Sequence, residues 1–553
     1  MTSIKTVLRR VEVKHTGEIY ADKPVTRWGN RDIFPVPLEQ RRFTWISYLS
    51  YWAIASLSVT AWSYGGSVVA LGLTAAEGIG CVVVASTFVG IFGFLCGHPG
   101  ANMHVGYTAL ARVTFGLYGS YIPILLLVLE NVVFFGIHGY FGGLAATVVI
   151  NAMSPKFMRW RNTLPESAAI TSQALIGFVI YVVVFLLLSI VHPSKYRNLV
   201  WPAAIVISVV LLGLLGWAIS ANGGTSGDLL AGKINLSSTD KSFAMLYAIS
   251  SAAGSSTAYA SRISDWTRFA KTKHSPTFAM LVAAPLFGCI GPIFGILATS
   301  AVYSRYGVVT WNPLALLLYV QETQYTAGCR TATFFAGIGL FVALIMNNMM
   351  GKILPAGMDL AGIVPKYITT RRGGLLLTII GVVIQPWRLV NGSSTFLTVL
   401  ISFGVFVAPL TGLLAADYWL IRRRKWVIPH IYKQDGIYWY TFGFNWRAYA
   451  AFILSWVFTM PGFAAAANED PESVAIGWIR LYQMSYIVNM AIAITTFCFL
   501  SLVFPPTGLG VSEPWDEGSA AGGTVHKPED APASGEKEEH VSEVECSSSV
   551  TKV

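Results

Sequence analysis

The sequence predicts an all-α polytopic membrane protein. Of the 553 residues, 54% are hydrophobic and only 12% are charged, which is about half the charged share of a soluble domain. The apolar residues are gathered in runs of roughly 20, the length at which an α-helix crosses a bilayer. Helices satisfy all their backbone hydrogen bonds internally, so runs of this length favour a bundle of membrane-spanning helices.

Residues 1–42 precede the first apolar run and are predicted to form a cytoplasmic N-terminal tail. They are polar, rich in Lys and Arg and without an early apolar core, so we expect no cleavable signal peptide. A twelve-span membrane domain is predicted for residues 43–505. Its spans are expected near residues 44–71, 76–97, 121–150, 169–192, 199–220, 243–262, 277–303, 332–356, 373–390, 394–421, 447–466 and 475–504.

Residues 506–553 differ in composition from the rest of the chain. They are rich in Gly, Ser, Glu, Lys and Pro and show no apolar periodicity, so they cannot bury enough surface to fold. We therefore predict a disordered cytoplasmic tail, and we expect any regulatory partners to bind one of the two tails.

The basic residues predict the orientation in the membrane. Twelve spans place both termini on one side, and the loops on that side hold most of the Lys and Arg, including the run from Arg422 to Lys425. Lys156, Arg159 and Arg161 are exceptions on the other side. The positive-inside rule then places both termini in the cytosol, as in a multi-pass protein of the plasma membrane.

Composition also argues against several classes of partner. The formal net charge is +10, but the basic residues form short clusters between apolar runs, so nucleic acid is not an expected partner. The six cysteines include no C-x-x-C pair, and we expect neither a metal site nor a cofactor. We find no H-E-x-x-H or G-x-S-x-G motif of an enzyme and no filter loop of a channel.

Charged residues inside spans are candidates for function because lipid makes them costly. Three of them lie near predicted span ends and are expected to reach the interface, and Asp359 is expected to pair with Lys366 at the cytoplasmic face. The full set is Glu77, Glu130, Arg262, Lys352, Asp359 and Arg388.

Glu130 and Lys352 lie deeper and are harder to explain as interfacial residues. A lysine at the bilayer centre costs about 2.5–3.5 kcal/mol, so Lys352 requires a carboxylate partner, a hydrated cavity or an anionic ligand. His138, in the same predicted span as Glu130, adds an imidazole that can change charge near neutral pH.

Two spans carry signs of a break in the helix. Span 1 contains ASLSVTAWSYGG and span 6 contains ISSAAGSSTAYAS, both dense in small and hydroxyl residues. Interrupted helices at matching positions in two halves indicate the midplane site of a secondary transporter. The alternative is that these small residues allow helices to pack closely.

Four stretches resemble a known family. They are NRDIFPVPLEQRRFTWISYLSYW before and within span 1, GHPGANMHVGYTALARVTFGLYGSYIP, LPAGMDLAGIVPKYITTRRG, and QPWRLV followed by FLTVLISFGVFVAPLTGLLAADYWLIRRRKW. They are similar to motifs of the nucleobase-cation-symport family one, in its fungal uracil/allantoin permease branch. The similarity covers roughly residues 28–505.

The resemblance implies a LeuT-like fold, with spans 1–5 and 6–10 as inverted repeats and two additional helices. It implies import of a small heterocycle such as uracil, allantoin or uric acid by alternating access, coupled to H⁺ in fungal members or to Na⁺ in some bacterial ones. The substrate contacts that it implies are Ser58, Phe134, His138, Ser255, Ser256, Tyr259, Asn348 and Lys352.

Two of these positions depart from the family pattern. His138 stands where the family has glutamine, and Lys352 stands where it has a second asparagine, which makes the pocket cationic or proton-dependent. Glu130 and His138 are the candidates for proton coupling. We therefore keep open a carboxylated or vitamin-like solute such as allantoate or nicotinate, and a transporter-derived sensor. For Lys352, a substrate carboxylate is favoured over Glu130 as the partner.

Overall fold

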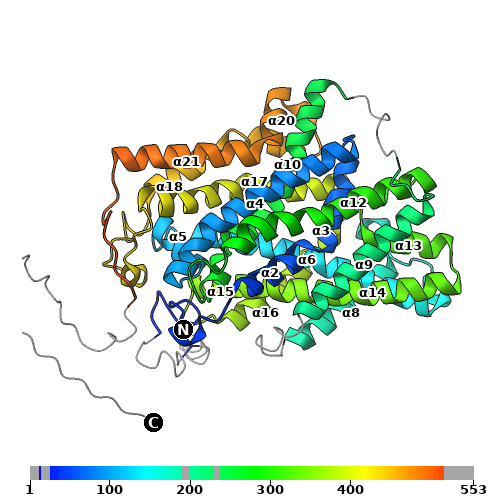
Figure 1. The fold of residues 1–553 in the computed structure, drawn as a ribbon, viewed down its shortest axis with the longest axis horizontal. Helices are drawn as coiled ribbons and strands as arrows, with labels where there is room; N and C mark the ends of the chain where they lie inside the picture. The colour runs from blue at the N-terminus through cyan, green and yellow to red at the C-terminus, as the bar shows by residue number, and fades with distance from the viewer. Residues whose placement is uncertain (1–11, 14–24, 190–199, 228–235, 516–553) are drawn as a thin grey trace, which may run out of the picture. The chain divides into compact units, whose positions relative to one another are not determined.

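A computed structural model describes residues 12–13, 25–189, 200–227 and 236–515. Regular structure in the described part of the chain is helical, and its only β contacts are three isolated bridges. The residues up to Trp515 form one compact unit, drawn in Figure 1. The predicted C-terminal tail from residue 516 onward lies outside the described residues, as does most of the N-terminal tail.

The first half of the chain contributes five long helices, one of them broken into α2 and α3, and two shorter ones. The predicted spans 1 to 5 correspond to α2–α3, α4, α6, α8 and α9. The bounds are α2 Trp45–Ser56, α3 Val59–Val69, α4 Ala75–Met103, α5 Tyr107–Phe115, α6 Tyr121–Met153, α7 Pro155–Met158, α8 Ser172–Ser189 and α9 Val200–Ala221.

The second half contains the remaining spans, several extended by a π-helical turn. The bounds are α10 Ser238–Ser261, α11 Ser264–Thr267, α12 Ala284–Tyr306, α13 Pro313–Thr323, α14 Ala327–Asn348, α15 Leu354–Ile363, α16 Thr370–Val383, α17 Ser393–Ala416, α18 Trp446–Val457, α19 Met460–Ala467, α20 Ile476–Gln483 and α21 Ser485–Val503. The π-helical turns are Ala279–Ala283, Met349–Ile353 and Asp417–Ile421.

Within the described residues, eight helices are long and apolar enough to cross a membrane, or nine if α18 and α19, bent by 55°, form one span. The three other predicted spans are the broken pair α2–α3, the serine-rich α10 and α16, which has 14 residues. The structure therefore confirms a polytopic helical protein without establishing the number twelve.

The predicted break in span 1 is confirmed. Helix α2 ends at Ser56, Leu57 and Ser58 leave the helical conformation, and α3 begins at Val59. The hydroxyl of Ser58 accepts a hydrogen bond of 3.2 Å from the backbone N–H of Ala61, which caps α3 in the usual manner of an N-terminal serine.

The predicted break in span 6 is wrong. Helix α10 is continuous through the serine-rich stretch and ends only at Ser261, with Arg262 as its C-cap. Gly254 lies directly against α17, because a Cβ at this position would come within 2.9 Å of the Cα of Gly404. The small residues of this span therefore serve close helix packing, the alternative that the sequence left open.

The helices pack as two groups. Helix α4 packs against α10 and α12, and α12 packs against α3, whereas α6 packs against α8 and α14, and α15 packs against α16. Helix α15 packs closely against the start of α16, since a Cβ on Gly357 would lie 2.1 Å from the carbonyl oxygen of Thr370. A larger residue than Gly357 would not fit there, two residues before the buried Asp359.

Part of the predicted N-terminal tail packs onto the helices. Trp28, Phe34 and Val36 are buried, and the side-chain amide of Asn30 donates to the carbonyl of Pro365 at 3.0 Å. The segment therefore covers the end of the protein at which α15 ends.

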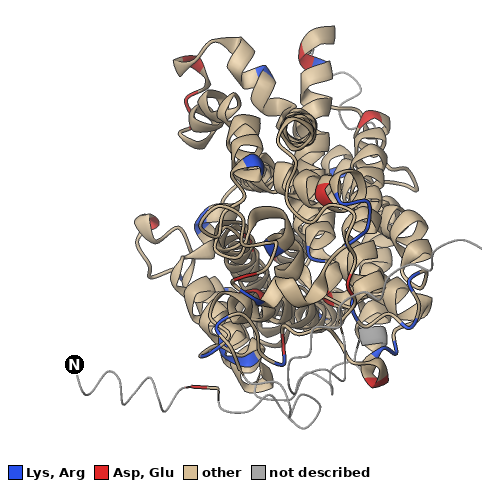
Figure 2. Ribbon diagram, turned by 90° about the vertical axis from the view of Figure 1, so that its left-hand side faces the viewer, with Lys and Arg blue, Asp and Glu red and all other residues tan. Residues whose placement is uncertain are grey.

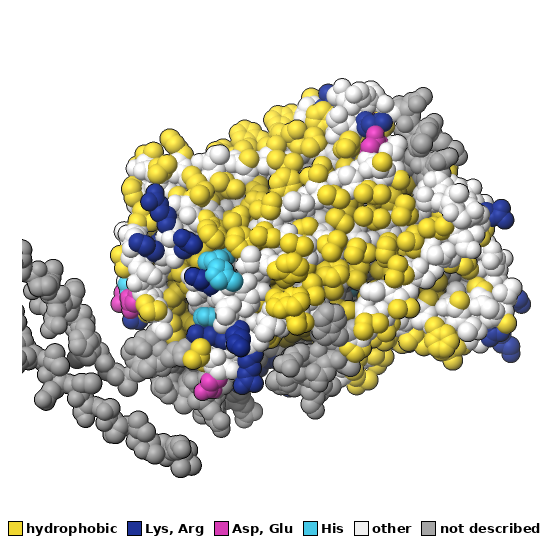
Figure 3. All heavy atoms as spheres, viewed as in Figure 1, with side chains coloured by type: hydrophobic (Ala, Val, Ile, Leu, Met, Phe, Trp, Pro, Cys, Tyr) yellow, Lys and Arg dark blue, Asp and Glu magenta, His cyan; other side chains and the backbone are white. Residues whose placement is uncertain are grey.

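The surface matches a lipid environment. Figure 3 shows a broad belt of hydrophobic side chains across one face, with Lys and Arg gathered at its two ends. Exposed apolar side chains on α4, α6 and α12 include Val83, Leu125 and Leu286. Charged residues occupy few positions along the helices (Figure 2), so those that are buried stand out.

Candidate functional site

The break in span 1 opens onto a cavity that the two helix groups share. It is bounded by α2, α3, α4, α6, α10, α12 and the π-helical turn after α14. Seven of the eight predicted substrate contacts line it: Ser58, Phe134, His138, Ser255, Ser256, Tyr259 and Lys352.

Asn348 is the exception, and its neighbour Asn347 lines the cavity instead. The reason is the π-helical turn at Met349–Ile353. A π turn holds an extra residue relative to an α-helix, so the cavity-facing partner of Lys352 lies five residues before it rather than four. The sequence also did not predict Trp52, Thr60 and Tyr64, which line the cavity as well.

Asn348 holds His138 in place from behind the cavity. Its side-chain nitrogen donates to the carbonyl of Phe135 at 3.2 Å and to the hydroxyl of Tyr181 at 3.0 Å. These bonds leave its oxygen to accept from Nδ1 of His138 at 3.2 Å. The Nε2 atom of His138 then accepts from the hydroxyl of Thr60 at 2.7 Å. The hydrogen bonds thus fit a neutral imidazole with its proton on Nδ1.

Lys352 lies between two aromatic rings at the cavity wall. Its Nζ atom is 4.6 Å from the ring centre of Phe134 and 4.3 Å from that of Tyr259. Both rings present an electron-rich face to the ammonium group. The hydroxyl of Tyr259 contacts the side-chain oxygen of Asn347 at 3.5 Å.

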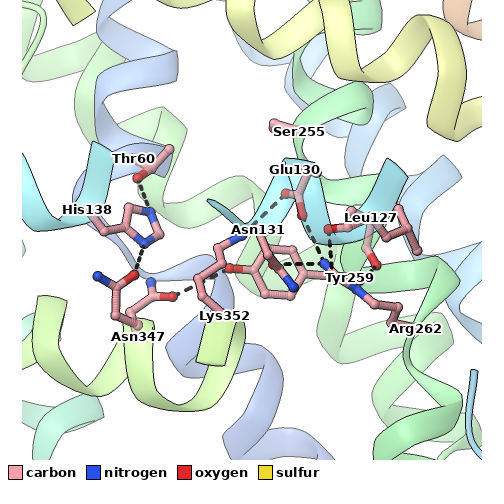
Figure 4. A network of polar contacts seen from close by, with 12 residues as sticks. Thr60, Leu127, Glu130, Asn131, His138, Ser255, Tyr259, Arg262, Asn347 and Lys352 are labelled. Atoms are coloured by element: carbon pink, nitrogen blue, oxygen red, sulfur yellow. Dashed lines mark hydrogen bonds and ion pairs between the residues drawn. The ribbon is translucent and has the colours of Figure 1, made fainter. Parts of the chain in front are cut away.

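Behind these rings the ammonium group of Lys352 meets Glu130. Nζ lies 3.4 Å from Oε1 of Glu130, and the other carboxylate oxygen, Oε2, lies 2.9 Å from Nη2 of Arg262. Figure 4 shows Glu130 between Lys352 and Arg262, with dashed lines to both. Glu130 is fully buried, and both cations are at most 3% exposed.

Arg262 is the centre of this network, and the prediction that it reaches the membrane interface is wrong. Its guanidinium also bonds Oδ2 of Asp359 at 3.4 Å and Oδ1 of Asn131 at 3.0 Å. The carbonyls of Leu127 and Ala258 accept from it as well, each at 3.3 Å. The end of α10 is covered by protein, so the guanidinium cannot reach water.

The predicted pairing of Asp359 with Lys366 is wrong too. Asp359 is fully buried against Arg262, whereas Lys366 lies at the surface and pairs with Glu12. Glu77 and Arg388 behave as expected of span-end residues. Glu77 caps the start of α4 and pairs with Lys241 at 3.1 Å, and Arg388 is exposed.

The four charges of the network sum to zero. Arg262 and Lys352 supply two positive charges, and Glu130 and Asp359 supply two negative ones. The sequence analysis assigned Arg262 to the interface because it is the last residue of a predicted span, 243–262.

Comparison with known proteins identifies the fold and family of this chain. The family described as permeases for cytosine/purines, uracil, thiamine and allantoin matches residues 35–489. This chain belongs to that family, the nucleobase-cation-symport family. It is a polytopic membrane transporter and not an enzyme.

Three individual proteins show how far the likeness extends. The transporter aclS of Aspergillus oryzae is 30% identical over 87% of this chain and 88% of its own length. The uridine permease of Saccharomyces cerevisiae is also 30% identical, over 87% of this chain and 75% of its own. The structure of MHP1, in a closed conformation with bromovinylhydantoin bound, shares 18% identity over 86% of this chain and 97% of its own, with a TM-score of 0.67. The fold is therefore LeuT-like, as the sequence predicted.

Proposed function

We propose that this transporter imports a neutral heterocycle of the nucleobase type, such as uracil, allantoin or the protonated form of uric acid, by H⁺ symport. We place it in the plasma membrane with both termini in the cytosol. The observation that carries the proposal is the charge-balanced network that ends in Lys352 at the cavity wall.

Charge balance favours a neutral substrate. The sequence favoured a substrate carboxylate as the partner of Lys352, but Glu130 already supplies that negative charge. A carboxylated solute would bring a fifth charge into a buried site whose four charges sum to zero, and an uncompensated buried charge is costly. The N-terminus of α3 and the ammonium of Lys352 instead suit the carbonyl oxygens of a neutral ring.

The network also supplies a reason for proton coupling. While Glu130 is ionised, Lys352 is held by its carboxylate. A proton on Glu130 releases the ammonium, which then needs another acceptor because it is buried. A carbonyl oxygen of the substrate is such an acceptor, so the proton and the substrate each favour binding of the other.

Of the two candidates for coupling, Glu130 fits this role better than His138. Both ring nitrogens of His138 are already satisfied in the neutral form, by Thr60 and Asn348. Coupling to Na⁺ is less well supported. A sodium ion needs oxygen ligands, and the stretch from Phe334 to Ile363, which covers most of span 8, contains no Ser or Thr hydroxyl.

The aromatic wall should contribute directly to substrate affinity. We expect Phe134→Ala to weaken binding by about 1–3 kcal/mol, the range for a base on an aromatic platform, which is roughly a 5- to 150-fold rise in Kd. Competition of unlabelled substrate against labelled uptake measures this change. Phe403, which contacts Phe134 from outside the cavity, is the matched control: Phe403→Leu should leave affinity within about twofold. Equal losses in both variants would remove Phe134 from the site.

Uptake by the wild-type protein tests the coupling. In cells that express the transporter, uptake of labelled uracil, allantoin and uric acid is measured as external pH is lowered. We expect at least one of them to be taken up faster at acid pH, and a protonophore to abolish its accumulation. Replacement of sodium by potassium should have no effect. Strict dependence on sodium would refute the proposal, and uptake of nicotinate or allantoate alone would favour an anionic substrate.

A further inference from the structure

Buried polar groups continue beyond Arg262 toward the end of the protein covered by the N-terminal segment. Asp265, in the short helix α11, is 2% exposed. Its Oδ1 atom accepts a hydrogen bond of 2.8 Å from the backbone N–H of Tyr107. Its charge acts on both Arg262 and Asp359, so it lies next to the network without belonging to any of its ion pairs.

Several atoms along this line have no hydrogen-bond partner within the described part of the chain. They are Oδ1 of Asp359, the hydroxyl of Tyr107 and Oδ2 of Asp265. The backbone N–H of Tyr107 bonds Asp265, and the charges of both aspartates act on its hydroxyl, so the three groups lie near one another. Buried polar atoms almost always bond something, and clusters of them are where ordered water is found.

A cleft reaches the same place from the N-terminal end of span 1. It is lined by Arg42, Tyr51 and Trp266, and also by Tyr259 and Asn347, which line the substrate cavity as well. Trp266 follows Asp265 in the chain, and Tyr51 lies within electrostatic range of Asp265, Arg262 and Glu130. The cleft therefore reaches the residue that follows Asp265 in the chain, and Tyr259 separates it from the substrate cavity.

We propose that the coupling proton leaves Glu130 for the cytosol by way of Asp359 and Asp265, with Asp265 as the last buried acceptor before the cleft. The inference rests on the proposed H⁺ symport. The O–H bond of protonated Glu130 breaks as one forms on Asp359, through water or the Tyr107 hydroxyl. A second transfer protonates Asp265, and water in the cleft takes the proton as hydronium. Arg262 and Arg268 stay protonated throughout.

The surroundings of Asp265 suit a group that both accepts and releases a proton. Burial raises the pKa of its carboxyl to about 6, while the bond from Tyr107 and the charges of Arg268 and Arg262 oppose that rise. Asp265 is therefore poised close to cytosolic pH, which is where a transient acceptor works best.

The test compares net transport with exchange in proteoliposomes, using Asp265→Asn. Asparagine keeps the acceptor for Tyr107 and removes only the ionisable group. The substrate is whichever of labelled uracil, allantoin or uric acid the wild-type protein takes up. We expect accumulation driven by an acid-outside pH gradient to fall more than tenfold. Counterflow exchange at equal pH should stay within about twofold of wild type, because exchange does not require the proton to be released.

Two further variants make the result decisive. Asp265→Glu should restore accumulation, and Asp240→Asn, which removes an exposed carboxylate from α10, should change neither readout. Normal accumulation by Asp265→Asn would overturn the inference, and so would a parallel loss of accumulation and exchange, which indicates a structural role. If accumulation by the wild-type protein does not depend on the pH gradient, the proposed symport is refuted instead.

Discussion

Replacing Arg262 with glutamine is expected to lower the stability of the folded protein by about 3–5 kcal/mol, the usual cost of removing one partner from a buried ion pair. The guanidinium contacts Glu130 and Asp359, and its loss leaves two buried carboxylates with Lys352 as their nearby cation. Total stabilities of domains are only about 5–15 kcal/mol, so much of the protein should fail to reach the cell surface. Thermal unfolding in detergent and the fraction delivered to the surface measure the effect.

Charge balance can be restored in this background. Arg262→Gln combined with Asp359→Asn leaves Lys352 and Glu130 as a neutral pair, so the double variant should regain part of the lost stability. Arg305, an exposed residue at the end of α12, provides the control, and Arg305→Gln should unfold at the wild-type temperature. Wild-type stability of Arg262→Gln would show that the guanidinium does not hold the network together.

The fold could be predicted from the sequence because lipid imposes a simple rule on it. Long apolar runs must be helices, and the break at Ser58 could be read from local composition because small and hydroxyl residues favour turns and caps. The same reasoning failed for α10. There the small residues make room for Gly404 of a distant helix, and no local pattern distinguishes a break from a close crossing.

The cavity was predicted more completely than the charges behind it. Phe134, His138 and Lys352 could be placed because the family motifs fixed their register. Asn348 was misplaced by one residue, since a π-helical turn changes which side chains share a face and leaves no clear mark in the sequence.

Arg262 and Asp359 were misjudged for a different reason. Their positions near span ends suggested contact with water, but the N-terminal segment and the short helices α5 and α11 cover that end of the protein. Burial of this kind depends on which segments meet in three dimensions. Hydropathy along the chain reports the distance of a residue from the middle of a span and nothing about what covers it.

Removing Lys352 and Glu130 separately and together should reveal what the pair does. Lys352→Asn leaves Glu130 and Asp359 to share Arg262, so we expect a loss of about 3–5 kcal/mol in stability and no transport. Glu130→Gln mimics the protonated carboxyl. It should still bind substrate, with an affinity that no longer varies with pH, but should lose accumulation by more than tenfold. The double variant contains the neutral pair Arg262–Asp359 and should recover most of the wild-type stability without recovering accumulation.

Thermal unfolding of the four proteins gives the interaction energy between the two side chains, which we expect at the upper end of the range of about 0.5–3 kcal/mol for neighbouring charged groups. Binding of the transported heterocycle at pH 5 and pH 7.5 gives the coupling. If Lys352→Asn unfolds at the wild-type temperature, and adding Glu130→Gln does not raise that temperature, then Glu130 is not the structural partner of Lys352. If that protein also lost an anionic solute and gained uracil, the charge of Lys352 would serve a substrate carboxylate, and the neutral-substrate proposal would fail. If the double variant recovers stability, Glu130 is the partner of Lys352. Removing Glu130 can compensate for the lost lysine only if the two side chains pair within the protein.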